Sequence, residues 1–271
     1  MTTTNHYNTS YDPDISNDRS RWMSKIPDNK SLADISIAGS HGSLVYYGGD
    51  AYQCQTFPIK KQFQAGIRFL DVSCKCKEEK LYIYQRSVNQ RTSFGDLLCS
   101  IFAFLNDNDS ECIILNVTPD ENENIENWNN LLHSYINAFG KRNFWLNDSI
   151  PEMKTARGKI VLLKPFVNAE IGIGNGHLDL FQNEHVRTLF SVASAWEGIN
   201  RHLKSIEYNP DKLFVTYCCG HSWFAYPYSV ANTLNQELLK FLEYQDLRSW
   251  GIIALDFPGL ELIEEIINSN D

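Results

Sequence analysis

A histidine at the end of an apolar run is the residue of this sequence best placed to do chemistry. Residues 35–43 read Ile-Ser-Ile-Ala-Gly-Ser-His-Gly-Ser, so the run ends in small residues around His41. Small residues let the backbone turn and let a ligand approach closely, and an imidazole exchanges protons near neutral pH. We interpret His41 as a general acid or base. The alternative is a histidine that is only hydrogen-bonded at a strand end.

An aspartate follows the last apolar run of the chain. Asp256 comes directly after residues 250–255. Taken alone, it could cap the helix that begins after Phe257-Pro258-Gly259. Asp256 is a candidate site residue only as a partner of His41, which requires the fold to bring the two residues together.

Apolar runs of strand length alternate with segments of helical periodicity. Strands are predicted at residues 32–37, 67–72, 81–84, 112–117, 160–163, 213–216 and 250–255, with one more between Ile171 and Val192. Helices are predicted at 57–64, 93–105, 125–139, 229–242 and 260–267. This alternation favours an α/β fold, a TIM-like (β/α)8 barrel that could be irregular or incompletely closed. His41 and Asp256 then lie at the carboxyl ends of the first and last strands, which adjoin in a barrel.

Composition narrows the class of protein. The 271 residues are 43% hydrophobic and 21% charged, with a net charge of −9, which suits a globular domain and argues against nucleic-acid binding. We expect a tail over residues 1–18 and one barrel domain over residues 19–271. The polar start resembles no secretory signal and no run is long enough to span a bilayer. A cytoplasmic protein is expected, although secretion by another route stays open.

The cysteines indicate a reducing compartment rather than a metal centre. There are seven of them, an odd number at irregular spacing. Cys74 and Cys76, with Cys218 and Cys219 much later, lack the two-residue spacers of zinc knuckles. We therefore predict neither a metal nor a cofactor.

Several motifs, taken together and in order, resemble the X domain of phosphatidylinositol-specific phospholipases C, particularly the small single-domain bacterial and metazoan forms. They are Trp22-Met23, Ile26-Pro27-Asp28, the run around His41, Gly66-Ile67-Arg68-Phe69-Leu70-Asp71, Leu81-Tyr82-Ile83-Tyr84-Gln85, Gln90-Arg91-Thr92-Ser93-Phe94, Ser110-Glu111-Cys112-Ile113-Ile114, the run from Ala156 to Lys164, and Gly251-Ile252-Ile253-Ala254-Leu255-Asp256. The resemblance implies a TIM-like barrel that cleaves the phosphodiester of phosphatidylinositol. It also implies that His41 is the general base for the inositol 2-hydroxyl and that Asp256 orients it.

Other positions depart from the family pattern. Gly42 stands where an acidic or amide residue is expected, and Ser73 where bacterial members carry a phosphate-binding arginine. Gln85 replaces the second histidine, which protonates the leaving alcohol, and an amide cannot supply that proton. The calcium ligands of the eukaryotic branch would fall at Gly42, Asp71, Ser73 and Thr118, which leaves one carboxylate. Since a general acid contributes about 10²–10⁴ in rate, the resemblance predicts an impaired or inactive enzyme.

Three groups could compensate in part. Asp71, Ser73 and Lys75 alternate onto one strand face, so Lys75 could meet the phosphate, and Arg86 could do likewise. His221 is the candidate for a relocated acid. Lys164 could contact phosphate or end a strand in solvent.

The aromatic segment from Trp223 to Tyr228 is a candidate contact surface. Trp223 and Tyr226 could enter a lipid interface, stack on a sugar ring, or simply pack in a loop. We therefore favour a binding protein for a phosphoinositide or inositol-phosphate head group, with a membrane surface as a further partner. The alternatives are an active phosphodiesterase that uses His41 and Asp256 with Lys75 or His221, and a scaffold for protein partners. Oligomeric state is not predictable from this sequence.

Overall fold

The computed structural model describes residues 6–10, 14–15, 17–120, 122–163, 171–182 and 186–271. The strands are β1 (Ile37–Ser40), β2 (Phe69–Lys77), β3 (Lys80–Gln85), β4 (Val88–Ser93), β5 (Ile113–Pro119), β6 (Phe144–Trp145), β7 (Ile160–Leu162), β8 (Leu178–Phe181), β9 (Leu213–Cys218) and β10 (Ile252–Leu255). The α-helices are α1 (Ile59–Ala65), α2 (Phe94–Asp107), α3 (Ile125–Phe139), α4 (Met153–Ala156), α5 (Val192–Ser205), α6 (Pro227–Glu243) and α7 (Leu260–Asn268).

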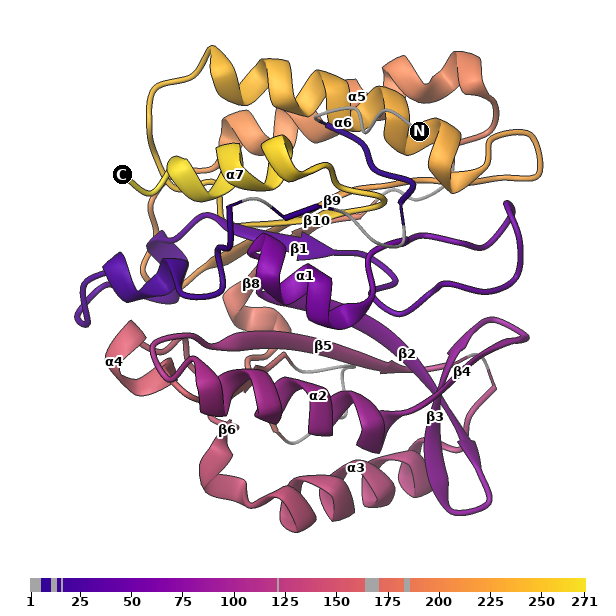
Figure 1. Cartoon of the computed structure of the whole chain (residues 1–271), viewed down its shortest axis with the longest axis vertical. Helices are drawn as coiled ribbons and strands as arrows, with labels where there is room; N and C mark the ends of the chain where they lie inside the picture. The colour runs from indigo at the N-terminus through magenta and orange to yellow at the C-terminus, as the bar shows by residue number, and fades with distance from the viewer. Residues whose placement is uncertain (1–5, 11–13, 16, 121, 164–170, 183–185) are drawn as a thin grey trace.

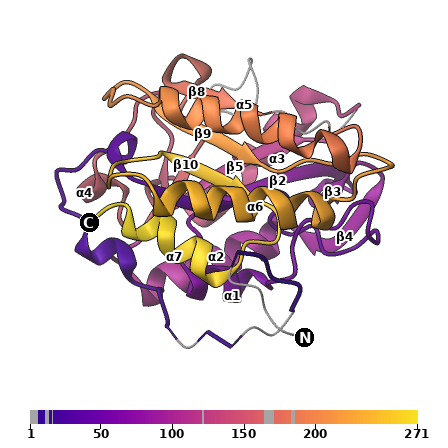
Figure 2. The ribbon, with the colours of Figure 1, turned by 90° about the horizontal axis from the view of Figure 1, so that it is seen from above.

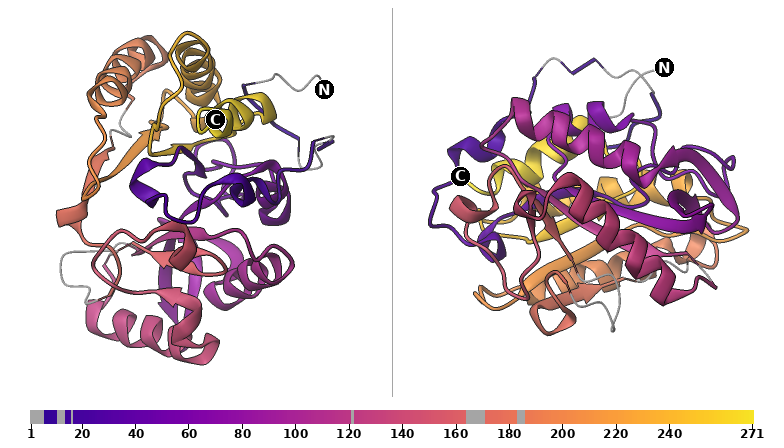
Figure 3. Two further views of the ribbon diagram at one scale, coloured as in Figure 1. Left: turned by 90° about the vertical axis from the view of Figure 1, so that its left-hand side faces the viewer. Right: turned by 90° about the horizontal axis from the view of Figure 1, so that it is seen from below.

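Eight strands form a curled parallel sheet in the order β6-β7-β5-β2-β1-β10-β9-β8. Helices cover its outer face, with α5, α6 and α7 on one side and α1, α2 and α3 on the other (Figure 1). Views from above and along the sheet show the same wrapping of helices around the strands (Figures 2 and 3). The predicted TIM-like α/β fold is confirmed, in an incompletely closed form that has β6 and β8 as its two ends.

The pairing of the first and last parallel strands of the chain determines where the functional residues lie. β1 pairs with β10 from Ile37 opposite Ile252 to Ser40 opposite Leu255. Both strands are buried throughout, as the apolar runs predicted. His41 and Asp256 are the next residues of the two strands, so in-register pairing brings them side by side.

Two predicted strands differ from the structure. Residues 32–37 contain a 3₁₀ helix, Leu32–Asp34, and the strand begins only at Ile37; apolar composition alone does not separate the two over so short a run. Residues 81–84 form a strand, β3, but it pairs antiparallel with the distal half of β2 and with β4. It therefore belongs to a hairpin that projects beyond the barrel strands in Figure 1 rather than to the barrel.

Most predicted helices are confirmed, because their ends carry local signals. α3 has the predicted bounds and ends before Gly140. Ser93 caps α2 in a capping box with Asp96. Pro227 begins α6, two residues before the predicted start. The predictions did not include α5, the helix that covers β9.

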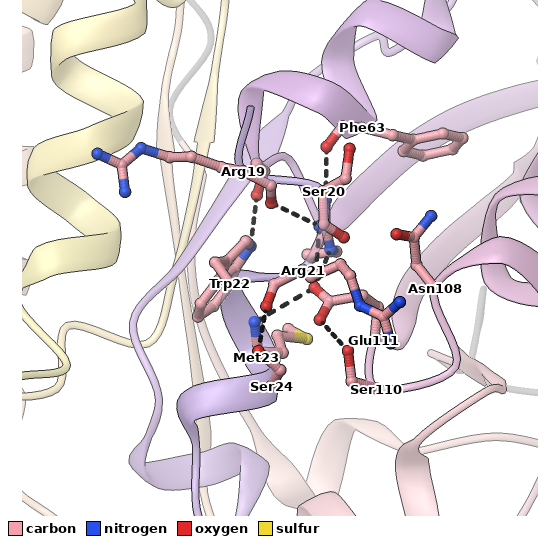
Figure 4. Close-up of polar contacts among 12 residues, drawn as sticks. Arg19, Ser20, Arg21, Trp22, Met23, Ser24, Phe63, Asn108, Ser110 and Glu111 are labelled. Atoms are coloured by element: carbon pink, nitrogen blue, oxygen red, sulfur yellow. Dashed lines mark hydrogen bonds and ion pairs between the residues drawn. The ribbon is translucent and has the colours of Figure 1, made fainter. Parts of the chain in front are cut away.

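A buried ion pair lies at the amino end of β2. The Arg68 guanidinium, wholly buried, contacts Glu111 at 2.9 Å and donates to the carbonyls of Phe63 and Ile67. Glu111 also accepts from the backbone of Met23 and the hydroxyl of Ser110 (Figure 4). This network joins the segment around Met23 to the starts of β2 and β5, at the end of the sheet opposite His41. Its role is therefore structural.

The described part of the N-terminal segment packs on the barrel. The backbone N–H of Asn8 donates to the carbonyl of Phe257 at 3.1 Å, and the carbonyl of Asn8 accepts from the Thr56 hydroxyl at 2.9 Å. The Tyr7 and Phe257 rings lie 5.8 Å apart. Two of these contacts are with Phe257, the residue that follows Asp256.

Candidate active site

His41 and Asp256 form a buried hydrogen-bonded pair at the carboxyl ends of β1 and β10. Nδ1 of His41 lies 2.8 Å from Oδ1 of Asp256, and the two residues are 6% and 1% exposed. The helix that follows has Gly259 rather than Asp256 as its N-cap residue. The pairing expected from the sequence is therefore present, and Asp256 does not cap the helix.

The electrostatics of the pair favour a protonated imidazole. Burial by itself lowers the pKa of His41, but the Cys219 side chain, the Asp256 carboxylate and the hydrogen bond to that carboxylate outweigh it, so that the pKa is raised well above 6.5. Cys54 acts in the same direction, and both thiols do so only when they are ionised. Burial raises the pKa of the Cys54 thiol to about 12, so this thiol is neutral near pH 7.

The loop after β1 is held by two buried glutamines. Gln55 donates from Nε2 to the carbonyls of His41 and Leu255, both at 2.8 Å. Gln62 donates from Nε2 to the carbonyl of Ser43 at 2.8 Å and accepts at Oε1 from the hydroxyl of Ser40. The two glutamine side chains thus fix the backbone on both sides of His41, and the contact with Asp256 orients its ring.

Gly42 turns the chain away from His41. Its φ is +49°, a left-handed conformation that favours glycine. A Cβ there would lie 3.0 Å from Val45 Cγ2 and 3.2 Å from Cys54 Sγ. The absence of an acidic or amide side chain at this position therefore goes with a tightly packed turn.

A cavity of about 250 Å³ opens beside this pair. Its lining includes seven positions singled out in the sequence: His41, Gly42, Asp71, Ser73, Gln85, Arg86 and Thr118. Gln85, at the end of β3, thus shares the cavity with His41. The β3–β4 hairpin, whose first strand we predicted wrongly as a barrel strand, therefore forms part of the wall of this cavity.

Other predicted residues lie elsewhere. Lys75 lies outside the described lining of this cavity, and its ammonium is 5.7 Å from the centre of the Tyr84 ring. His221 and Trp223 line a neighbouring cavity of about 230 Å³ instead. Lys164 falls outside the described residues. Trp223 and Tyr226 are 77% and 36% exposed, so Trp223 is not a packed loop residue.

Arg86 connects the two cavities. It lines both of them, and its Nη2 lies 2.6 Å from Nε2 of His221. Its φ is +53°, a strained conformation for a non-glycine residue that is often associated with function. Arg86, which the sequence offered as an alternative to Lys75, thus lines the cavity, whereas Lys75 lies outside its described lining.

Sequence reasoning missed several residues of the site. Asn116 donates from Nδ2 to Oδ1 of Asp71 at 2.8 Å and lies 3.4 Å from the Tyr217 hydroxyl. Tyr217 packs edge-on against His41, with ring centres 5.9 Å apart, and burial raises its pKa well above 10. Asp120 adds a carboxylate to the cavity that the aligned calcium positions do not include. These residues lie near the carboxyl ends of β5 and β9. Their positions could have identified them, because the active sites of barrels gather at strand ends.

Known proteins of one family are similar to this chain. Residues 28–149 match the family described as PI-PLC X 1. The 1-phosphatidylinositol phosphodiesterase of Listeria monocytogenes is 29% identical over 281 residues, which cover 92% of this chain and 84% of that protein. The chain is similar to the phosphatidylinositol-specific phospholipase C X-domain family, over residues 28–149 by the family match and over 92% of its length by this relative. The resemblance inferred from the motifs is therefore confirmed.

The likeness to this family extends to the fold. The structure of the phosphatidylinositol-specific phospholipase C from Listeria monocytogenes gives a TM-score of 0.85 at 26% identity, over 94% of this chain and 100% of that one. The 1-phosphatidylinositol phosphodiesterase of Staphylococcus aureus strain Newman is 22% identical over 94% of this chain and 96% of that protein. The family match ends before Asp256, so this residue is assigned by its contact with His41. Among the described residues, no helix is both long and apolar enough to cross a membrane.

Proposed function

We propose that this chain binds a phosphoinositide or inositol-phosphate head group in the cavity beside His41 and cleaves it poorly or not at all. The carrying observation is that Gln85 lines the same cavity as His41, where the family's second histidine would act. Fold and family support the head-group pocket. The substitution at Gln85 supports the loss of turnover.

The first half of the cleavage reaction has its residues. His41, held by Asp256 at 2.8 Å, can take a proton from a hydroxyl once its own proton has left. The second half needs a donor for the departing alcohol, and the Gln85 amide is not acidic at neutral pH. The other titratable groups of the described lining are carboxylates, a buried phenol and a guanidinium. None of these donates a proton as readily as an imidazolium near pH 7.

The cavity retains an anion-binding group. Ser73 carries no charge, but Arg86 lines the same cavity, and its guanidinium, which contacts His221, has a geometry that matches a phosphate. Together with a protonated His41, it makes the cavity favourable for a phosphate monoester or diester. Binding is therefore better supported than catalysis.

Two further features support the setting expected from the sequence. Trp223 and Phe224 are 77% and 80% exposed beside the second cavity, as aromatic side chains that enter a lipid interface are. The seven cysteines are all free thiols, which suits the cytoplasm. A membrane surface is the proposed source of the head group.

The second candidate is an active phosphodiesterase, and the intact His41–Asp256 pair favours it. In this version Lys75 or His221 would supply the missing groups. Lys75 would have to leave the Tyr84 ring, and His221 would have to leave Arg86. These displacements make it the less favoured candidate.

Calorimetry and a turnover assay separate the two candidates. We expect heat on titration with inositol 1-phosphate, reduced by His41→Ala but not by His133→Ala, a histidine in α3 away from the cavity. Little or no release of inositol phosphate from phosphatidylinositol vesicles is expected. Efficient turnover that disappears in His41→Ala would establish the second candidate, and absence of both heat and turnover would overturn both.

A further inference from the structure

A cysteine completes a cluster of three different ligand types around the catalytic pair. A ring nitrogen of His41, Sγ of Cys54 and a carboxylate oxygen of Asp256 all lie within 4.8 Å of one another. The three residues come from the end of β1, the loop before α1 and the end of β10. The sequence gives no spacing motif for such a set.

Nitrogen, sulfur and oxygen donors together suit a thiophilic divalent cation. Zn²⁺ binds imidazole nitrogen and carboxylate oxygen at about 2.0–2.2 Å and thiolate sulfur at about 2.3 Å. Ligand atoms around a tetrahedral ion of that size are roughly 3.3–3.8 Å apart by the same geometry. Small side-chain rotations are therefore enough to close the cluster on an ion.

The backbone beneath the three side chains is already fixed. The N–H of Cys54 donates to the carbonyl of Val45 at 3.1 Å, and the carbonyl of Cys54 accepts from Phe257 at 2.9 Å. Asn235 donates from Nδ2 to the carbonyl of Asp256 at 2.9 Å. A site whose scaffold is held in this way loses little conformational entropy when it takes up an ion.

Charge and access also fit a divalent ion. A thiolate and a carboxylate together neutralise its two positive charges, so the buried complex carries no net charge. Without metal, the Cys54 thiol donates to the carbonyl of Tyr52 at 3.3 Å. On binding, that proton and the proton on the ligating nitrogen of His41 leave to solvent. His41 lines the cavity, which gives the ion a way in and a position for a water molecule as fourth ligand.

We propose that His41, Cys54 and Asp256 form a binding site for a thiophilic divalent cation such as Zn²⁺, and that the bound ion takes His41 out of acid–base chemistry. If Nε2 of His41 binds the ion, the reactive nitrogen is blocked. If Nδ1 binds it, the contact with Asp256 is replaced. Either arrangement converts the pair from a proton acceptor into a metal centre.

Cobalt substitution tests the site without any assay of turnover. Titration of the whole chain with Co²⁺ is expected to give a thiolate-to-cobalt charge-transfer band and tetrahedral visible bands that saturate at one equivalent, and Zn²⁺ is expected to remove them. Cys54→Ser abolishes these bands. Cys99→Ser, which removes an exposed thiol on α2, leaves them unchanged.

A second variant covers the case in which Cys54→Ser disturbs the fold. Asp256→Asn keeps the thiol and weakens Co²⁺ binding at least tenfold, with the charge-transfer band retained at saturation. A band that persists in Cys54→Ser, a band lost in Cys99→Ser, or no band at all would overturn the proposal. Head-group binding is measured separately, so failure of the metal site leaves the proposed function untouched.

Discussion

Arg86 and His221 are hydrogen-bonded across the mouth of the barrel, with Nη2 and Nε2 2.6 Å apart. A guanidinium can only donate, so Nε2 of His221 accepts and carries no proton in this arrangement. The contact therefore orients Arg86 between the two cavities. While this contact is made, Nε2 of His221 cannot act as a proton donor.

Replacing Arg86 tests whether it recognises phosphate. Since a hydrogen bond to a charged group contributes about 1.5–3 kcal/mol, Arg86→Gln is expected to raise the dissociation constant for inositol 1-phosphate roughly 10- to 100-fold. Binding of inositol itself changes little. Arg91→Gln is the control, because Arg91 lies 4.2 Å over the Tyr47 ring instead. Equal losses in both variants, measured by calorimetry, would assign the effect to general charge.

Restoring the second imidazole is expected to raise turnover. Gln85→His places an acid in the wall of the cavity that contains His41, and a general acid contributes about 10²–10⁴ in rate. We expect release of inositol phosphate from phosphatidylinositol vesicles to increase at least about tenfold. Gln85→Asn, which adds no titratable group, leaves turnover unchanged. If both variants behave alike, the missing acid is not what limits the reaction.

The His41–Asp256 pair predicts a pH dependence of both activity and stability. Because the pKa of His41 is raised by its neighbours, Asp256 among them, the pair's stabilisation is complete below the unfolded pKa of ~6.5 and is lost as pH rises through the folded pKa. Any residual turnover rises over the same alkaline range, since His41 must lose its proton to act. Asp256→Asn lowers the pKa of His41, and NMR titration of the ring measures that change. Unchanged titration would refute the coupling.

The buried Arg68–Glu111 pair predicts a large stability effect far from the site. Glu111→Ala leaves the wholly buried guanidinium unpaired, which is expected to cost about 3–5 kcal/mol of unfolding free energy. Asp109→Ala breaks the ion pair between Asp109 and Arg21, in which the Asp109 side chain is 85% exposed. This substitution is expected to change stability little. Urea denaturation compares the two. A small effect of Glu111→Ala would mean that water or a neighbouring group solvates Arg68.

The exposed aromatic side chains predict selective loss of vesicle binding. Burying a large apolar side chain contributes about 1.5–3 kcal/mol, so Trp223→Ala is expected to weaken binding to phosphatidylinositol vesicles roughly 10-fold or more. Tyr244→Ala removes an aromatic that is 84% exposed at the far end of α6 and serves as the control. Co-sedimentation that falls equally in both variants would rule out a defined docking face.

Residues that end a parallel strand could be placed from the sequence. His41 and Asp256 each follow a short apolar run, and the rule that strand ends gather at one rim of a barrel brings them together. The cap at Ser93 and the end of α3 at Gly140 could also be predicted, because each depends on a signal in the local sequence.

Residues whose place depends on partners distant in sequence could not be read in this way. β3 has the composition of a barrel strand, and only its antiparallel pairing with β2 reveals that it walls the cavity. Cys54 lies in a loop whose path depends on Gln55 and Gln62. Arg86 was left uncertain because the direction of a hairpin turn is set by tertiary contacts.

The adjacency of β1 and β10 has a consequence for biosynthesis. The imidazole and its carboxylate are 215 positions apart along the chain, and neither can meet the other until the final strand has been made and has docked. A nascent chain, or one cut short before that strand, has no dyad, and it also lacks the strand that joins β1 to β9 in the sheet. Ionisation of His41 therefore reports whether the barrel has been completed.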